Sequence, residues 1–348
     1  MKIDLEFLGA LTEAPGISGH ESRVRSLIRD KVAPYADEVR TDAMGNLFIT
    51  KKSKGRGRKL RVMLAAHMDE VGLLITFVDK SGYLRFTRVG GIDPRLLPAK
   101  RVLVGPKNVP GVIGTWPVHF LRRRTDRDRV PSDEELAIDI GASSQEEAQA
   151  LAGPGDYAYF GTKTERWGDI LKAKALDDRL GCYLLTELLK NRYPFDLEAV
   201  FTVQEEVGLR GAAVAAYDFR PDLAFILEGT GAADFPLAQK SGQGSTPALG
   251  GGPVITVMDR SVFCDRHLVQ LLIDTSKSLG IPYQLKRPGI GGTDAGRISL
   301  SGGGVRTAVV AVACRYIHSP AALTSIRDIH RCLKLMHESL KHLNNLKI

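Results

Sequence analysis

The strongest constraint on the fold is an interruption in an otherwise regular alternation of helix and strand patterns. Near the N-terminus, apolar residues at helical spacing are followed by short runs of β-forming residues. Between about residues 70 and 163 this alternation stops, and many short strand-like pieces are separated by glycine and proline. It resumes from about Trp167. The pattern predicts an α/β catalytic domain, residues 1–69 and 164–348, into which a small β-rich domain, residues 70–163, is inserted.

The spacing of apolar residues delimits elements of the α/β part. The stripe from Leu5 to Leu11 predicts a first helix that ends before Pro15. Ser18 and Glu21 have the spacing of a capping box for a second helix. Farther along, strand and helix patterns alternate in the order typical of parallel strands joined by helices. We therefore expect a mixed, mostly parallel sheet flanked by helices.

Composition excludes several classes of protein. The 348 residues are 43% hydrophobic and 25% charged, which is typical of a globular protein with a sizeable core. No apolar run approaches the roughly 18 residues needed to cross a membrane, and Asp4 and Glu6 interrupt any N-terminal signal sequence. The four cysteines are far apart and form no Cys-x-x-Cys pair, which argues against a disulfide framework or a zinc ribbon. We expect a soluble, cytoplasmic protein.

The net charge of +8 arises largely from two local basic segments, residues 51–59 and 122–129. Neither segment is interleaved with aromatic residues, as surfaces that bind single-stranded nucleic acid usually are. Both lie between apolar stretches, which is typical of solvated hairpin loops. The sequence therefore predicts neither a nucleic-acid partner nor a membrane partner.

Residues that can bind metals follow four of the predicted strands. Ligands of open α/β sheets bind at the carboxyl ends of the strands, so the residues at these ends are informative. The strand ends supply imidazole and carboxylate groups, namely His67, Asp69, Glu205, Glu206, Glu228 and His318. Asp177, beside Asp178, stands just before a further helix, where it can join them. We expect these side chains to meet at one edge of the sheet.

Such a group of residues favours a metal centre. Carboxylates a few Å apart cannot all be ionised unless cations lie between them. Histidine nitrogen and carboxylate oxygen are ligands of catalytic zinc, and these donors are too many for one tetrahedral ion. They suit two ions that share a bridging carboxylate. Asp69 can accept the second N–H of the His67 ring, and of Glu205 and Glu206 one can bind metal while the other accepts a proton.

Two other motifs do not support a site. His337 and His342 are one residue too far apart for the metalloprotease helix motif. The glycine-rich segment 289–296 has the spacing of neither a dinucleotide fingerprint nor a P-loop. We expect it to be a flexible loop near the site, with Thr293 and Asp294 as its polar tips.

The same residues lie in motifs that resemble the tetrahedral aminopeptidases, the family that includes glutamyl aminopeptidases and proteins often labelled endoglucanase M. The matching motifs extend over nearly the whole chain and include PGISGHE at Pro15, AAHMDEVG at Ala65, ALDDRLG at Ala175, VQEEVGLRGA at Val203, GGTDAG at Gly291 and IHSPAA at Ile317. The resemblance implies a zinc-aminopeptidase-like fold. It also implies that the inserted domain is a small β-barrel, or PDZ-like, dimerisation domain.

The resemblance further implies a centre of two divalent ions, zinc or cobalt, with manganese as a third option. Asp177 would bridge the ions and would be followed by a cis peptide bond. His67 and Glu228 would complete one site, and Glu206 and His318 the other. Glu228 stands where many members of the family have aspartate, so the longer carboxylate is expected to change how its ion is held.

The predicted function is that of a metal-dependent aminopeptidase that removes N-terminal residues from short peptides. Glu205, the general base implied by the resemblance, would activate a metal-bound water, with Asp69 as a second catalytic residue. The subunits are expected to form dimers that assemble into a dodecamer. One alternative is a metal-dependent deacylase or an endoglucanase-like glycosidase, whose two carboxylates would have to flank a sugar about 5 to 9 Å apart. Another is a non-catalytic scaffold that binds peptides.

Overall fold

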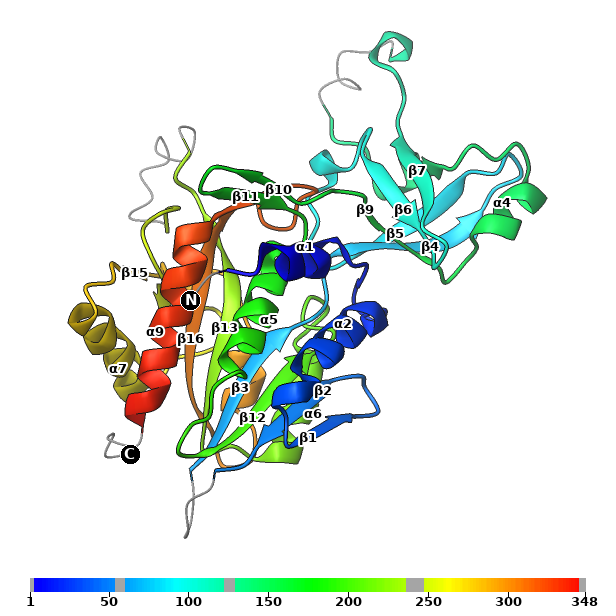
Figure 1. The fold of residues 1–348 in the computed structure, drawn as a ribbon. Coiled ribbons are helices and arrows are strands. Elements are labelled where there is room, and N and C mark those ends of the chain that lie inside the picture. Colours follow the sequence, from blue (N-terminus) through cyan, green and yellow to red (C-terminus); the bar gives the residue numbers. More distant parts are fainter. Residues whose placement is uncertain (1–2, 54–59, 122–128, 236–246, 344–348) are drawn as a thin grey trace.

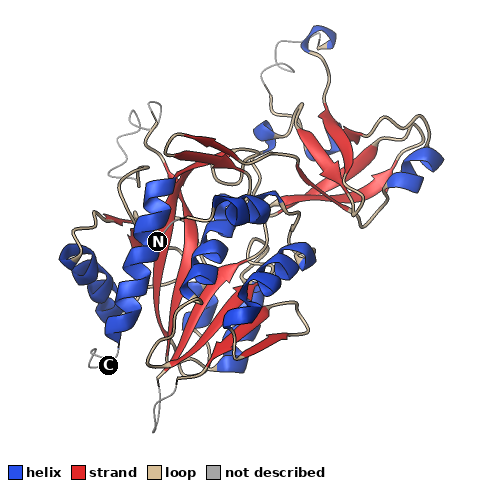
Figure 2. Cartoon of the chain, viewed as in Figure 1, coloured by secondary structure: helices blue, strands red, loops and turns tan. Residues whose placement is uncertain are grey.

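The computed structural model describes residues 3–53, 60–121, 129–235 and 247–343. Within these residues the chain forms an 11-stranded sheet with helices on both faces and a separate closed barrel (Figures 1 and 2).

The helices are α1 (Leu5–Glu13), α2 (Ser22–Val32), α4 (Gln145–Leu151), α5 (Leu176–Leu188), α6 (Arg210–Phe219), α7 (Arg266–Ser278), α8 (Ala295–Ser299) and α9 (Ile326–His342). The strands of the large sheet are β1 (Glu38–Thr41), β2 (Leu47–Lys51), β3 (Arg61–His67), β10 (Glu165–Trp167), β11 (Ile170–Ala173), β12 (Asp196–Thr202), β13 (Leu223–Ala232), β14 (Val254–Thr256), β15 (Gln284–Leu285), β16 (Arg306–Arg315) and β17 (Ala322–Ser325). The strands of the barrel are β4 (Gly72–Val78), β5 (Leu84–Val89), β6 (Arg101–Val104), β7 (Val109–Gly114), β8 (Ala137–Asp139) and β9 (Tyr157–Phe160).

The centre of the large sheet is parallel. Its strand order is β1-β2-β12-β3-β13-β16-β17-β11-β10, and the neighbours β12, β3, β13 and β16 run in the same direction. The outer strands pair antiparallel, as β2 does with β12 and β17 does with β16. This arrangement confirms the predicted mixed sheet with a parallel core. It also brings the carboxyl ends of the four central strands to one edge of the sheet.

Both faces of the central strands are buried. In β3, Val62, Leu64 and Ala66 pack in the larger core cluster, to which α1, α2, α5, α7 and α9 contribute. Met63 and Ala65 pack on the opposite face, against α6 and α8. Figure 1 shows α1, α5 and α9 together over the first of these faces. Because successive side chains of a strand alternate between faces, burial of both faces produces the continuous apolar run seen in the sequence.

The inserted segment closes into a barrel in the order β4-β5-β8-β7-β6-β9, with β9 pairing back to β4. Its strands enclose an apolar core of their own, distinct from the cores of the large sheet. The chain enters the barrel after β3 and returns through β10 and β11 to the large sheet, and in Figure 1 the barrel projects from one end of that sheet. The predicted β-barrel insertion is therefore confirmed.

The predicted capping box at the start of α2 does not form. The helix begins at Ser22, and Glu21 precedes it without a side-chain capping bond. The Ser18 hydroxyl instead donates to a carboxylate oxygen of Asp69 at 2.7 Å, and Glu21 accepts the main-chain N–H of Gln204 at 3.2 Å. Both side chains are used to hold the ends of β3 and β12, which are distant in sequence.

The two basic segments are only partly described, since residues 54–59 and 122–128 lie outside the described ranges. Lys51 is 5% exposed, and its ammonium group donates to the main-chain carbonyls of Leu189 and Asn191, at 2.6 Å from the latter. The prediction of a solvated loop is therefore wrong for Lys51. Its charge is used to satisfy carbonyl groups after the end of α5.

All four cysteines are free thiols, of which Cys182, Cys314 and Cys332 are buried and Cys264 is partly buried. Among the helices of the described ranges, none is both long enough and apolar enough to pass through a membrane.

Candidate metal centre

The residues predicted from separate parts of the chain line one cavity of about 430 Å³. It includes His67, Asp177, Glu205, Glu206, Glu228 and His318. His67 is the last residue of β3, the two glutamates follow β12, and Asp177 lies in the first turn of α5. Glu228 differs from the prediction because β13 continues to Ala232, so its carboxylate comes from within a strand and not from a strand end.

Asp177 occupies the middle of the group. Its Oδ1 atom lies 3.3 Å from His67 Nε2, and its Oδ2 atom lies 3.4 Å from His318 Nε2. Each imidazole also meets a second carboxylate, because His67 Nε2 is 3.2 Å from Glu228 Oε1 and His318 Nε2 is 3.2 Å from Glu206 Oε1. The peptide bond after Asp177 is cis, as the resemblance implied. The two oxygens of the Asp177 carboxylate thus face two different imidazoles, those of His67 and His318.

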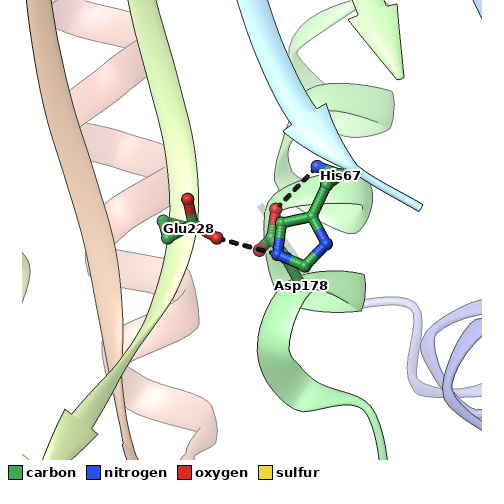
Figure 3. Close-up of side chains that lie close together, drawn as sticks. All are labelled: His67, Asp178 and Glu228. Atoms are coloured by element: carbon green, nitrogen blue, oxygen red, sulfur yellow. Dashed lines mark hydrogen bonds and ion pairs between the residues drawn. The ribbon is translucent and has the colours of Figure 1, made fainter. Parts of the chain in front are cut away.

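Asp178 has a different role from its neighbour. One of its carboxylate oxygens accepts the main-chain N–H of His67 at 3.1 Å, and the other accepts that of Gly181 at 2.8 Å. Figure 3 shows its carboxylate behind the His67 ring, with the ring nitrogen turned toward Glu228. The donor atoms of His67, Asp178 and Glu228 also lie within 4.8 Å of one another. Because main-chain groups already use both oxygens of Asp178, Asp177 is the better candidate ligand.

Asp69 lies beside the candidate ligands and is fully buried. We expected its carboxylate to accept the second N–H of His67, but the main-chain carbonyl of Asp69 is closer to His67 Nδ1, at 3.1 Å against 3.5 Å. The carboxylate instead accepts the main-chain N–H groups of Glu205, at 3.0 Å, and Glu206, at 3.1 Å. Asp69 therefore orients the imidazole through its backbone and holds the segment of the two glutamates through its side chain.

Burial and neighbouring charges shift the pKa values of the acids and imidazoles in the site. It raises the pKa of Glu205 to about 10 and that of Glu228 to about 8, although the nearby His67 acts in the opposite direction. Burial alone would lower the pKa of His318, but carboxylates, Asp177 first among them, raise it to about 11. The acids repel one another and attract protons, which is the condition that bound cations relieve.

The donor set fits divalent metal ions. Glu228 Oε2 is buried and has no hydrogen-bond partner in the described part of the chain, an arrangement that is costly unless a cation or a donor meets it. Asp177, Glu206 and His318 offer ligand atoms within 4.8 Å of one another. Histidine nitrogen and carboxylate oxygen are ligands that zinc and related ions accept.

The glycine-rich loop lies beside the site, as expected, because Gly291, Gly292 and Thr293 line the cavity. Its polar residues are not exposed tips, since Thr293 is 2% and Asp294 1% exposed. Asp294 accepts the Thr202 hydroxyl at 2.5 Å, and burial raises the pKa of Asp294 to about 6. A short polar pattern cannot separate a buried loop from a solvated one, because only tertiary packing covers it.

Sequence reasoning missed several contributors to the cavity. Lys286 and Arg287 line it, immediately after the two-residue strand β15, which is too short to produce a strand pattern. Gly91, between β5 and β6 of the inserted segment, places its carbonyl oxygen 3.0 Å from His318 Nδ1. Because a main-chain carbonyl has no side-chain signature, no motif could have identified this contact.

Comparisons with known proteins identify relatives of this chain. A family model described as M42 glutamyl aminopeptidase matches residues 45–335. The lysyl aminopeptidase of Pyrococcus furiosus is 34% identical over 350 residues, which cover 98% of each chain.

Two solved structures share the fold. A TET aminopeptidase from a marine sediment archaeon, Thaumarchaeota archaeon SCGC AB-539-E09, has a TM-score of 0.91 and 34% identity, and the match covers 97% of both chains. The TET1 peptidase of Pyrococcus horikoshii has a TM-score of 0.85 and 36% identity, with 97% of this chain and 98% of that one covered. The match of family, sequence and fold over nearly the full length shows that this chain belongs to the M42 glutamyl aminopeptidase family, a family of peptide hydrolases.

Proposed function

We propose that the chain is a metal-dependent aminopeptidase that removes N-terminal residues from short peptides. The observation that supports it most directly is the position of Asp177, whose two oxygens face His67 and His318 in one cavity. A cavity of about 430 Å³ has the size of a typical small-molecule site. The N-terminal residue of a peptide, together with the peptide bond after it, has a size that fits this cavity.

In this proposal His67 and Glu228 would hold one divalent ion, Glu206 and His318 would hold another, and Asp177 would be a ligand that both share. Zinc or cobalt is the expected metal, and manganese is a third option. Such ions, when bound, acidify water and polarise a carbonyl oxygen. The Glu228 side chain reaches the group from inside β13, with its Oε1 atom 3.2 Å from His67 Nε2.

Glu205 is the proposed general base. Its carboxylate lines the cavity together with His67 and Glu206. One Glu205 oxygen would take a proton from the attacking water and then deliver it to the nitrogen of the leaving amine. Asp69 is a positioning residue, because it holds the main-chain N–H of Glu205 at 3.0 Å and that of Glu206 at 3.1 Å.

Metal removal is the first test of this function. Exhaustive chelation should abolish the hydrolysis of a panel of aminoacyl anilides, and addition of zinc, cobalt or manganese should restore it, because the buried acids need cations to act together. Turnover would be followed from release of the aniline, and bound metal by elemental analysis. Full peptidase activity in metal-free protein would refute the proposal. Hydrolysis of cellulose derivatives by the chelated protein would support the glycosidase instead.

We also propose that the inserted segment, residues 70–163, pairs subunits of a homo-oligomer, with residues 1–69 and 164–348 as the catalytic domain. Trp116 and Phe120 follow β7 and are 68% and 66% exposed. The centroids of their rings lie 6.4 Å apart. Aromatic side chains are enriched at protein–protein interfaces, which is why this exposed pair is a candidate contact. The related TET1 peptidase of Pyrococcus horikoshii assembles into a tetrahedron or an octahedral shell. The four free thiols support the proposal of a reducing, cytoplasmic location.

Light scattering of the purified protein should therefore give a mass close to twelve times the 37.9 kDa of one chain. Replacement of both aromatics, Trp116→Ser with Phe120→Ser, should shift the mass toward smaller species, because an exposed apolar contact would be lost. A single-chain mass for the unaltered protein at micromolar concentration would contradict the proposed assembly.

A further inference from the structure

We propose that Glu21 and Asn46 are positioning residues for the reaction, because together with Asp69 they fix the main chain that carries the two glutamates of the site. The inference rests on the proposed function, in which Glu205 is the general base and Glu206 a metal ligand. Glu21 is 4% exposed and Asn46 is fully buried, and neither belongs to the residues that line the cavity. Both therefore act on the site through the backbone.

Four successive main-chain N–H groups beyond β12 are accepted by side-chain oxygens from other segments of the chain. The strand ends at Thr202, and the four groups that follow belong to residues 203–206. Their acceptors come from three segments and are all buried, namely Glu21, Asn46 and Asp69. We call these three side chains the clamp. Because a buried N–H group without an acceptor is costly, the clamp takes over from the strand pairing that ends at Thr202.

Each residue of the clamp holds a different part of this segment. Asn46 accepts the N–H of Val203 at 3.0 Å, and Asp69 accepts those of both glutamates. Between them, Glu21 accepts the N–H of Gln204 at 3.2 Å. Gln204 has a φ of +57°, in the left-handed region that residues other than glycine seldom adopt. The clamp therefore fixes a conformation that the segment would not favour by itself, and from it both glutamates reach the cavity.

Neighbouring groups hold Glu21 and Asn46 in turn. The side-chain amide of Asn46 donates to Asp42 Oδ2 at 2.7 Å and to the Gly211 carbonyl at 3.0 Å. A Cβ atom at Gly211 would lie 2.3 Å from Asn46 Oδ1, so any other residue there would displace Asn46. Glu21 uses the same oxygen to accept the N–H of Gly19, at 2.7 Å. A reacting carboxylate needs such support, because a shift of about 1 Å can lower a rate about 100-fold.

The first test removes the acceptor of the Gln204 N–H group. Glu21→Met should lower kcat for aminoacyl anilides by about 10- to 100-fold with little change in KM, because Glu21 lies outside the cavity and acts only through the placement of the glutamates. Glu21→Gln keeps an oxygen that can accept both N–H groups, so it should retain most of the wild-type kcat. Asn46→Ala removes the neighbouring acceptor and should have the same effect as Glu21→Met.

Glu198→Met is the matched control. Glu198 is also a buried carboxylate, 3% exposed, and it lies within β12, where it accepts the Thr50 hydroxyl at 2.8 Å. Its replacement should lower the stability of the protein but leave kcat unchanged, because it holds no part of residues 203–206. The control therefore separates a loss of positioning from a general loss of stability.

Hydrogen exchange, followed by mass spectrometry, gives a readout that depends on neither turnover nor bound metal. In the unaltered protein, peptides that contain residues 203–206 should be protected although they lie beyond the strand. Glu21→Met and Asn46→Ala should each speed exchange there by about tenfold or more, as expected for loss of a buried acceptor. Glu21→Gln and Glu198→Met should leave it near the wild-type rate.

Three results would overturn the inference: wild-type kcat in folded Glu21→Met or Asn46→Ala, equal losses in Glu21→Met and Glu21→Gln, or exchange of residues 203–206 that neither variant changes. If the unaltered protein hydrolyses no anilide, the proposed function fails, and hydrogen exchange still decides whether the clamp holds this segment.

Discussion

Replacing Glu205 with glutamine is expected to lower kcat for aminoacyl anilides by about 10²- to 10⁴-fold, the usual contribution of a general base. Glutamine has nearly the same shape, so the cavity should keep its form, but the amide cannot accept a proton. Burial raises the pKa of Glu205 to about 10, against the opposing effect of His67. Cations bound at the centre would lower this pKa, so that the carboxylate could accept a proton. We expect the metal content to remain at the wild-type level, because the proposed ligands are untouched.

Single-turnover kinetics and elemental analysis of the same preparation would check this result. Asp69→Asn is the variant to compare with it. The Asp69 carboxylate accepts the main-chain N–H groups of Glu205 and Glu206, so this replacement should lower activity or metal affinity by about 10- to 100-fold. Near wild-type turnover in Glu205→Gln would end its assignment as the base. A large loss of metal would show instead that Glu205 is a ligand, an arrangement that its proximity to His67 and Glu206 also allows.

The second large effect concerns stability. Lys174→Met is expected to lower the free energy of unfolding by about 3 to 5 kcal/mol, because it removes a partner from a buried carboxylate. Glu70 is 3% exposed, and its two oxygens lie 2.6 and 2.8 Å from Lys174 Nζ. Burial lowers the pKa of Lys174 to about 8, against the opposing effect of Glu70, so the ammonium is charged at pH 7. Arg179 also contacts Glu70, at 3.4 Å, but is too distant to replace the lost bonds.

The same ion pair joins two segments of the candidate site. Glu70 follows Asp69, and Lys174 lies between β11 and the turn that presents Asp177. Methionine would leave the Glu70 charge without its closest partner in a low-dielectric region, which explains the size of the expected effect.

Urea titrations at one protein concentration, followed by circular dichroism, would measure the change. Lys172→Met is the matched control, because Lys172 pairs at 2.7 Å with the half-exposed Glu165, and loss of such a pair should cost less than about 1 kcal/mol. Adding Glu70→Gln to Lys174→Met should restore part of the stability, because it removes a buried charge that has lost its closest partner. Equal losses for the Lys172 and Lys174 variants would contradict the argument.

The sequence was informative where local patterns reflect the environment directly. β3 is buried on both faces and therefore reads as a continuous apolar run, and α1 ends before Pro15 as its apolar stripe indicates. The region with glycine and proline between short strand-like pieces forms the barrel. These elements depend on spacing over a few residues, which a single sequence records.

Predictions failed where side chains form hydrogen bonds with residues that are distant in the sequence. Ser18 has the spacing of a helix cap but donates to Asp69, and Lys51 looks like a loop cation but satisfies carbonyls beyond α5. Asp294 was expected to be exposed, whereas it is buried and accepts a hydrogen bond from the Thr202 hydroxyl. In each case the competing partner lies 50 or more residues away in the chain, so no local pattern could reveal it.

The sequence alone determined the alternation of elements, the inserted barrel and the chemical types gathered at the strand ends, because these follow from short-range spacing and from the carboxyl-end rule of parallel sheets. Only the tertiary structure decided which oxygen faces which nitrogen: Asp177 toward both imidazoles, Asp178 toward the backbone, and Asp69 toward the glutamate segment. Adjacent aspartates are equivalent in a sequence, and the non-helical backbone of both residues in the first turn of α5 sends their side chains in different directions. The cavity wall that places Lys286 beside these groups is likewise a product of packing between segments far apart in the chain.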